Sequence, residues 1–216
     1  LKIAGMPLYD ALIHAFSTAG TGGFSNRNAS VGAYNSAAID IIITIFMLLF
    51  SINFAAYFLI LTKKWREALA SDELRFFLSV VAGATAIITL ANLGVYASVW
   101  ESLRYTAFQV ASIISTTGFG TADFVLWPKF SQMIIVLLMF CGASAGSTGG
   151  GMKCSRVLIL LRTIRREVHR ITHPRSVEVV KLDGKLVGES TLHSLLVFLG
   201  AYVSVIFGAA LIISLD

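Results

Sequence analysis

The chain has 216 residues, of which 56% are hydrophobic and only 13% are charged, and its formal net charge is +5. Its mean hydropathy of +0.79 is far from that of a soluble domain with a solvated surface, so the composition argues against a soluble protein and predicts an integral membrane protein. The two cysteines are too few for a disulfide framework and are expected to be free thiols, and the four histidines are not at metal-ligand spacing.

Four segments are long enough to cross a hydrocarbon core of about 30 Å, which takes about 20 helical residues. A charged side chain at the centre of such a helix costs roughly 2.5 to 3.5 kcal/mol, so four uncharged runs of this length predict four membrane-spanning helices. They cover residues 41–61, 76–100, 130–152 and 192–215.

A short apolar stretch and a glycine-rich turn precede the first of these segments. Residues 8–16 are too few to cross a bilayer, so we expect a half-helix there. The glycine-rich turn 18–25 and the polar loop 26–36 then lead into a spanning helix expected over about 37–62. Within that helix Asn53 is expected to form an interhelical hydrogen bond rather than to line a pore.

A basic loop over residues 63–75 separates the first two spanning segments, and the positive-inside rule predicts that it is cytoplasmic. Its basic residues are Lys63, Lys64, Arg66 and Arg75. The second span then runs outward, so residues 100–128 begin outside the membrane. Within them, residues 105–114 form a second apolar stretch that is too short to cross. A re-entrant helix and loop fit there, because non-helical backbone at membrane depth must be satisfied by protein or a water-filled cavity.

The sequence Ser-Thr-Thr-Gly-Phe-Gly at 115–120 follows this second short stretch. A backbone that turns its carbonyls toward an ion needs residues that tolerate unusual dihedral angles, and Gly118 is the best candidate. Taken alone, the hexapeptide is more typical of an ordinary turn.

The two short stretches and their turns match at an offset of 95 residues, which indicates an internal repeat. The matched pairs are Ser17 with Ser112, Thr21 with Thr116, Gly23 with Gly118 and Phe24 with Phe119. Each unit has the form half-helix, turn, outer loop, inward helix. At this period the neighbouring units would lie before Leu1 and beyond Asp216, so we expect the chain to be the middle of a longer array.

A glycine-rich run over residues 142–152 occupies the inner half of the third predicted span. The Gly142 and Gly146 pair also forms a G-x-x-x-G packing pattern, which leaves a continuous helix with a small-residue face as an alternative. We favour an interruption of the helix, because each interior glycine costs roughly 1 kcal/mol relative to alanine and three follow one another.

A basic segment follows the glycine run. Its charge either sets the orientation of the chain in the membrane and attracts anionic lipid, or forms a docking surface for a cytoplasmic partner. Its basic residues are Lys153, Arg156, Arg162, Arg165, Arg166, Arg170, Arg175, Lys181 and Lys185. Residues 182–185 predict a tight β-type turn.

These motifs resemble those of the Trk/Ktr/HKT superfamily of potassium transporters, and in particular the bacterial Trk potassium-uptake subunits. The stretches FQVASIISTTGFGTADF at 108–124 and GASAGSTGGGMK at 142–153 are similar to the third repeat of that family, and HAFSTAGTGGFS at 14–25 is similar to its second. The resemblance implies an all-α membrane protein of tandem helix–pore-loop–helix repeats with re-entrant half-helices. In the family, four such units surround one potassium pathway.

The resemblance also implies where this chain binds and gates potassium. Carbonyls and hydroxyls of the two turns would form the filter, with potassium held at Thr21, Gly22, Thr116 and Thr117. The filter residues are Ala19, Gly20, Thr21, Gly22, Gly23, Ser115, Thr116, Thr117 and Gly118. The interrupted helix would be a gating loop over about 141–152, with Gly142, Gly146, Gly149, Gly150, Gly151 and Lys153. Asp123, just outside the filter, either concentrates cations or is a solvated loop carboxylate.

The resulting expectation is potassium uptake through a multi-pass protein of the bacterial inner membrane, surrounded by lipid. The resemblance implies a homodimer bound to a cytoplasmic nucleotide-binding regulatory subunit, with no organic cofactor and no nucleic-acid partner. The expected divisions are a second pore unit at 1–62, a cytoplasmic loop at 63–75, a third pore unit at 76–161, a basic cytoplasmic segment at 162–191 and the outward helix of a fourth unit at 192–216.

Three other interpretations of these motifs compete with the potassium pathway. The run at 146–153 resembles a nucleotide-binding phosphate loop, but Met152 separates the last glycine from Lys153 and Cys154 stands where Ser or Thr is needed, so we expect no enzyme. A broken-helix secondary transporter with a different or sodium-coupled substrate is the alternative function. A purely structural membrane subunit leaves the two matching turns unexplained.

Overall fold

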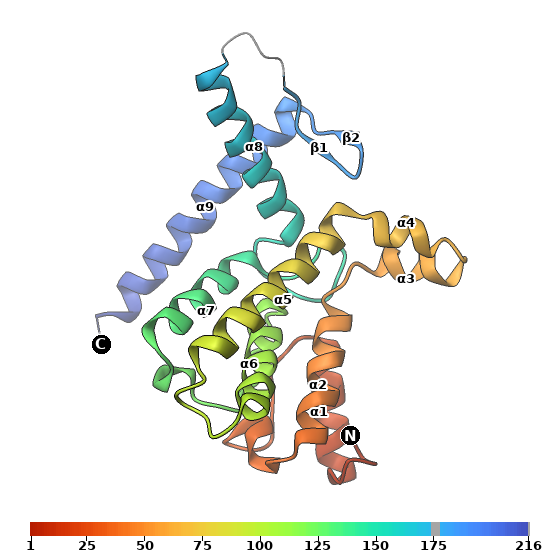
Figure 1. Cartoon of the computed structure of the whole chain (residues 1–216), viewed down its shortest axis with the longest axis vertical. Coiled ribbons are helices and arrows are strands. Elements are labelled where there is room, and N and C mark those ends of the chain that lie inside the picture. Colours follow the sequence, from red (N-terminus) through yellow and green to blue (C-terminus); the bar gives the residue numbers. More distant parts are fainter. Residues whose placement is uncertain (174–177, 216) are drawn as a thin grey trace. The chain divides into compact units, whose positions relative to one another are not determined.

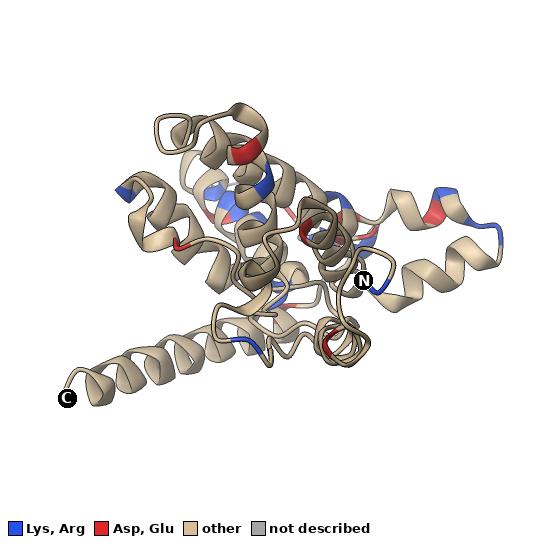
Figure 2. Ribbon diagram, turned by 90° about the horizontal axis from the view of Figure 1, so that it is seen from below, with Lys and Arg blue, Asp and Glu red and all other residues tan. Residues whose placement is uncertain are grey.

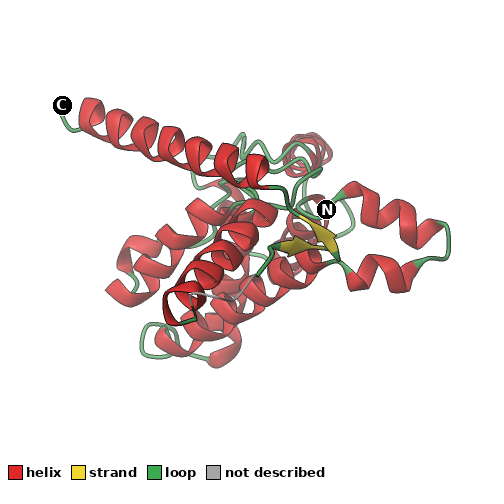
Figure 3. Cartoon of the chain, turned by 90° about the horizontal axis from the view of Figure 1, so that it is seen from above, coloured by secondary structure: helices red, strands yellow, loops and turns green. Residues whose placement is uncertain are grey.

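The computed structural model describes residues 1–173 and 178–215, and over this part of the chain the secondary structure is helical apart from one short hairpin (Figures 1 and 3). The chain divides into two compact units, Leu1–Ser155 and Arg156–Asp216. The first unit holds both predicted turns and the glycine-rich run, so the whole candidate site lies within it.

The first unit is built from α-helices of 6 to 20 residues. Its α-helices are α1 (Leu8–Ala19), α2 (Ala37–Phe50), α3 (Phe54–Leu61), α4 (Trp65–Ala70), α5 (Asp72–Ala91), α6 (Val99–Ile114) and α7 (Lys129–Cys141), with 3-10 turns η1 (Ser30–Tyr34) and η2 (Phe124–Leu126). Helix α8 (Cys154–Thr172) begins at the end of this unit. Helix α6 packs against α2, α5 and α7, and therefore joins the two predicted repeats.

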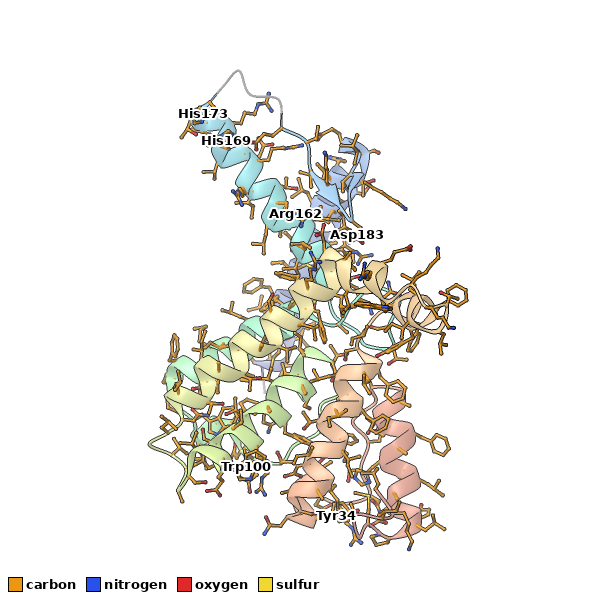
Figure 4. The ribbon with its side chains drawn as sticks, turned by 45° about the vertical axis from the view of Figure 1, so that its right-hand side comes forward. Tyr34, Trp100, Arg162, His169, His173 and Asp183 are labelled. Carbon is orange, nitrogen blue, oxygen red and sulfur yellow. The ribbon has the colours of Figure 1, made fainter. Side chains whose placement is uncertain are left out.

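Both predicted half-helices are present as α1 and α6. The second begins at Val99 rather than at residue 105, because the Ser98 hydroxyl accepts the Glu101 N–H at 3.1 Å and so caps a longer helix. The sequence prediction began too late, because Glu101 and Arg104 interrupt the apolar run. Trp100 lies in the first turn of this helix (Figure 4).

The first predicted span, residues 41–61, is not one straight helix. Helices α2 and α3 meet at an angle of 91° across a break at residues 51–53. The Asn53 side chain accepts the Ala55 N–H at 2.8 Å and caps α3, so the expected interhelical bond of Asn53 is wrong. The Phe54 N–H donates to the Gly146 carbonyl at 3.0 Å, which places the glycine-rich run against the break.

The helices found at the other three predicted spans differ in length from the predicted segments. Helices α5 and α9 (Glu189–Ile213) are each long and apolar enough to cross a membrane, and the bent pair α2 and α3 passes the same test together. Helix α5 ends at Ala91 instead of about 100, and α7 is a shorter apolar helix that ends at Cys141. The interruption after α7 confirms that the third span is broken. Figure 2 shows few charges along these helices.

One hydrophobic core joins the two repeats of the first unit. Phe119, from the second turn, is 2% exposed and packs among side chains of the first repeat, with its ring centroid 5.5 Å from that of His14. The buried members of this core are Met6, Ala11, Val31, Ile39, Ile43, Met47, Phe108, Ala111 and Phe119. The matching residue of the first turn, Phe24, is 77% exposed.

The second unit contains the remainder of α8, the hairpin of β1 (Lys181–Leu182) and β2 (Lys185–Leu186), and α9. Asp183 and Gly184 have φ angles of 48° and 74°, which confirms the predicted tight turn. Ile159 of α8 packs with Val180, Leu192 and Leu195 in a small core of its own. His169 and His173 stack with ring centroids 4.5 Å apart near the end of α8 (Figure 4).

Candidate ion filter and its underlying loop

The turns that follow α1 and α6 have the same backbone hydrogen bonds at the same offset of 95 residues. Each half-helix ends with a bond to the residue four positions earlier, and the next turn closes with a bond spanning five residues. The paired bonds are Gly20 N–H to Phe16 O (2.9 Å) with Ser115 N–H to Ala111 O (3.0 Å), and Gly22 N–H to Ser17 O (2.7 Å) with Thr117 N–H to Ser112 O (3.0 Å). The internal repeat predicted from sequence is therefore present in the backbone.

Each turn also places a threonine and a glycine in the left-handed region of backbone space. The φ angles are 48° at Thr21 and 70° at Gly23, and 60° at Thr116 and 83° at Gly118. A β-branched residue rarely adopts this conformation, and such strain persists only where the surroundings fix it. The threonines are fixed in part by their own hydroxyls, which donate to the preceding carbonyls of Gly20 and Ser115 at 2.8 and 2.6 Å.

The two turns touch each other. A Cβ added to Gly23 would lie 2.1 Å from the Thr117 carbonyl oxygen, so only glycine allows this approach. Beyond the turns, the Gly32 N–H donates to the Gly120 carbonyl at 3.0 Å. The structure therefore brings the two predicted filter segments together.

Side chains of the half-helices brace the turns from behind. The Ser112 hydroxyl donates to the Phe119 carbonyl at 2.6 Å, and the Gln109 amide donates to the Ala122 carbonyl at 2.5 Å. In the first repeat, His14 Nε2 lies 3.0 Å from the Ser25 hydroxyl. All three bracing side chains are at least 98% buried.

A polar cluster that the sequence analysis missed anchors the start of α1. The Asp10 carboxylate accepts hydrogen bonds from Tyr34 (2.7 Å), Asn26 (2.6 Å) and Arg27 (2.9 Å). These bonds, with that of Tyr34 the strongest, hold the pKa of Asp10 below its ordinary value, at about 2. Tyr34 lies at the same end of the unit as the start of α1 (Figure 4). The sequence feature that could have indicated this cluster is Asp10 itself, a charged residue in the first turn of an otherwise apolar half-helix.

The segment expected to be a gating loop, about 141–152 with Lys153, is found as a loop over residues 142–153, because Cys141 ends α7. We call residues 142–153 the gating loop after that expectation, and they lie against the ends of both half-helices. The Thr21 hydroxyl donates to the Thr148 carbonyl at 3.0 Å, and the Thr116 hydroxyl accepts the Gly150 N–H at 2.6 Å. The loop is therefore bonded to the same position of both turns. The Lys153 ammonium donates to the Gly149 carbonyl within the loop.

The glycines of the gating loop are required by close contacts rather than by helix packing. A Cβ on Gly142 would lie 2.9 Å from the Gly151 Cα, and a Cβ on Gly149 would lie 2.8 Å from the Ser115 carbonyl oxygen. Gly142, Gly146 and Gly151 also have φ angles near +70° to +79°. The alternative of a continuous helix with a G-x-x-x-G face is thereby excluded.

The gating loop also docks on the break between α2 and α3. The Ser144 N–H donates to the Ser51 carbonyl at 3.0 Å, and the Thr148 hydroxyl donates to the Phe50 carbonyl at 3.2 Å. The Glu73 side chain of α5 accepts a further loop N–H, that of Ala145. The sequence did not predict a functional role for Phe50, Ser51 or Glu73. Ser51 and nearby Asn53 are nevertheless polar residues in an otherwise apolar run.

The remaining expected residues have local roles. The Asp123 carboxylate accepts the Val125 N–H at 2.9 Å and caps η2. Cys141 and Cys154 are free and buried, with their sulfur atoms 3.5 Å apart. Over the described residues there is no group of three or more His, Cys, Asp or Glu side chains suited to a metal ion. Arg175 of the basic segment lies outside the described residues.

The fold and site together define a membrane protein built from repeated units, in which re-entrant half-helices end in glycine-rich turns above an interrupted helix. The family model described as "TrkH: Cation transport protein" matches residues 3–215. The chain belongs to this family.

Individual relatives agree with the family assignment. The chain is 37% identical over 209 residues to the Trk system potassium uptake protein TrkH of Salmonella typhimurium, covering 94% of this chain and 42% of the relative. It is also 37% identical over 211 residues to the protein of the same name from Halomonas elongata, with 94% and 43% covered. The solved structure of the potassium transporter TrkH from Vibrio parahaemolyticus superposes with a TM-score of 0.89 at 34% identity, covering 94% of this chain and 44% of that one. The chain thus spans less than half the length of these relatives.

Proposed function

We propose that this chain forms part of a pathway for potassium uptake across a membrane, with the two turns as half of the filter and residues 142–153 as the gate. One observation carries the proposal: Thr21 and Thr116 occupy equivalent strained positions in two repeated turns, and the same glycine-rich loop is bonded to both. The names of the relatives, which describe potassium uptake proteins, support the identity of the ion.

The proposed chemistry is coordination rather than reaction, as expected for a transporter and not an enzyme. Potassium sheds its water readily enough for neutral carbonyl and hydroxyl oxygens to replace it. The filter segments contain no charged side chain. Helices α1 and α6 both end at the turns, so the negative ends of their dipoles favour a cation there.

The gating part of the proposal rests on the loop bonds. While the Gly150 N–H is bonded to the Thr116 hydroxyl, the loop lies directly against the second turn. An ion that leaves the filter on this side meets the loop. Displacement of the loop then opens the path without any change in the filter. The alternative of a broken-helix secondary transporter is not favoured, because it requires no repeated turn.

The assembly and location follow from the family resemblance. We propose a homodimer in the bacterial inner membrane, in contact with a cytoplasmic nucleotide-binding regulatory subunit through the basic segment at 153–185. In the described part of this segment, Arg166 is already paired with Glu167 and Glu189 at 2.9 and 2.7 Å. Arg165 is exposed, and a crosslinker attached at this position tests whether the basic segment contacts the regulatory subunit.

Flux measurements on the full-length transporter in liposomes test the function. Radioactive rubidium serves as the potassium surrogate, with competition by potassium and by sodium. We expect uptake that potassium suppresses and sodium does not, and a loss of that preference in Gly118→Ser. Gly94→Ala is the matched control, because Gly94 lies in open space away from both turns. Uptake that sodium and potassium suppress equally, or an unchanged preference in Gly118→Ser, contradicts the filter assignment.

A further inference from the structure

The Glu73 carboxylate connects the two ends of the gating loop. It lies in the first turn of α5 and is 7% exposed. One of its oxygens, Oε1, accepts the Ala145 N–H at 2.6 Å and the Ser155 N–H at 3.1 Å. Ala145 is near the start of the loop and Ser155 follows its end, so a single oxygen atom binds both flanks.

The bond to Ser155 also caps a helix from outside. Ser155 is in the first turn of α8, where backbone N–H groups have no partner within the helix. A carboxylate at this position is favoured by the helix dipole, and its bonds are stronger than those between neutral groups. Glu73 therefore fixes the start of α8 relative to α5 as well as the loop.

Displacement of the loop breaks this arrangement cooperatively. Because Oε1 accepts both bonds, a shift of either Ala145 or Ser155 disturbs the geometry of the other bond. A buried carboxylate that loses its donors is destabilised, which opposes undocking of the loop. A displacement of α8 along its axis pulls Ser155 away from Glu73 and loosens the loop.

We propose that Glu73 is a positioning residue that holds the gating loop in its docked position and transmits movement of α8 to it. The inference rests on the proposed function of residues 142–153 as a gate. Glu73 of α5 thereby connects the gating loop to α8, the helix that leads into the basic segment.

The test compares three variants of the full-length transporter in liposomes. Glu73→Ala removes the acceptor, Glu73→Gln keeps an oxygen that accepts both N–H groups, and Glu67→Ala is the control. Glu67 is an exposed carboxylate of α4 that forms a surface ion pair with Lys64 at 3.7 Å. Two quantities are measured for each variant: rubidium flux per folded transporter, and the rate at which a maleimide modifies the buried thiols of Cys141 and Cys154, located by mass spectrometry of their peptides.

We expect Glu73→Ala to raise both the thiol modification rate and the flux about tenfold, with the preference for potassium over sodium unchanged because the filter is untouched. Glu67→Ala should behave as the unmodified protein, and Glu73→Gln, which keeps an oxygen acceptor but loses the charge, should lie between the unmodified protein and Glu73→Ala. A merely structural role of Glu73 lowers the yield of folded protein and changes neither the flux nor the thiol modification rate per folded molecule, and that result overturns the proposal.

The thiol measurement separates this inference from the proposed function. An unchanged modification rate in Glu73→Ala overturns the role of Glu73, whatever the flux. A raised modification rate with unchanged flux confirms that Glu73 holds the loop and refutes the assignment of the loop as the gate.

Discussion

The Thr21 hydroxyl donates a hydrogen bond to the Thr148 carbonyl, 3.0 Å away and 127 residues later in the chain. Thr21 belongs to the first turn and Thr148 to the gating loop, so this bond joins one filter segment directly to the element beneath it. The second turn makes the corresponding connection through Thr116 and Gly150, with donor and acceptor reversed. The loop is thus held by both repeats, and loss of either bond should weaken its docking.

The first prediction removes one of these two bonds. In Thr116→Val the Gly150 N–H loses its acceptor, which costs about 1 kcal/mol, or roughly a fivefold decrease in the docked population of the loop. We expect faster maleimide modification of Cys141 and Cys154 in Thr116→Val than in Thr116→Ser, which keeps the hydroxyl. Equal modification rates in these two variants show that the bond does not hold the loop.

The second prediction separates two reasons for glycine in the filter. Gly23→Ala places a Cβ 2.1 Å from the Thr117 carbonyl oxygen, so the second turn must move. In Gly118→Ala the added Cβ meets no atom within 4 Å. The only cost is that alanine must adopt a left-handed backbone conformation, which destabilises the fold by about 1 to 2 kcal/mol. Selectivity and thermal stability should therefore fall much further in Gly23→Ala. They are measured from ion competition and from the melting temperature in detergent, and a larger loss in Gly118→Ala contradicts the close approach of the two turns.

The parts of the site that local residue chemistry determines were predictable from the sequence. Glycine and threonine at matched positions indicated the repeated turns, and three successive glycines indicated the interruption after α7. Both features require backbone conformations or approaches that few residues allow. The membrane class followed from composition alone.

Features that depend on contacts between distant residues were not predictable in this way. Ser51 and Asn53 are isolated polar residues in a long apolar run and do not by themselves indicate a break. The break there is stabilised by the Gly146 carbonyl, which lies far along the chain. In the sequence Glu73 is indistinguishable from an ordinary acidic residue in the first turn of a helix. Its role could not be predicted because its two donors, the N–H groups of Ala145 and Ser155, approach it only in the folded chain. The start of α6 was missed because Glu101 and Arg104 interrupt the apolar run before residue 105, although Ser102 beside them is buried in the protein.

The third prediction concerns the pH dependence set by Asp10. Its folded-state pKa of about 2 is lower than the ordinary value for an aspartate, so its ionised form stabilises the fold. That contribution is fully present above about pH 4 and is lost as the pH falls toward about 2. Asp10→Asn cannot ionise, so its stability should be lower than that of the unmodified protein at neutral pH, and the difference should shrink in this acidic window.

Melting temperatures of both proteins across this pH range provide the measurement. Asn26→Ala serves as a comparison, because it removes one donor to Asp10 and leaves the carboxylate in place. We expect it to lower the melting temperature less than Asp10→Asn does. A constant difference between the unmodified protein and Asp10→Asn from neutral pH down to about 2 contradicts the assignment.

The last prediction shortens the gating loop. Removing residues 146–151 deletes the Thr148 carbonyl and the Gly150 N–H, and with them the bonds that these two groups make to the first and second turns. The Ala145 and Ser155 bonds to Glu73 use residues outside the deletion, so the flanks retain an anchor. Rubidium flux should therefore rise while the preference for potassium over sodium persists. Replacement of the same six residues by six alanines is the matched comparison, and because a Cβ at position 149 meets the Ser115 carbonyl oxygen at 2.8 Å, that variant should also undock the loop. A full-length transporter that reaches the membrane folded and has unchanged flux with either loop shows that residues 146–151 do not limit the passage of the ion.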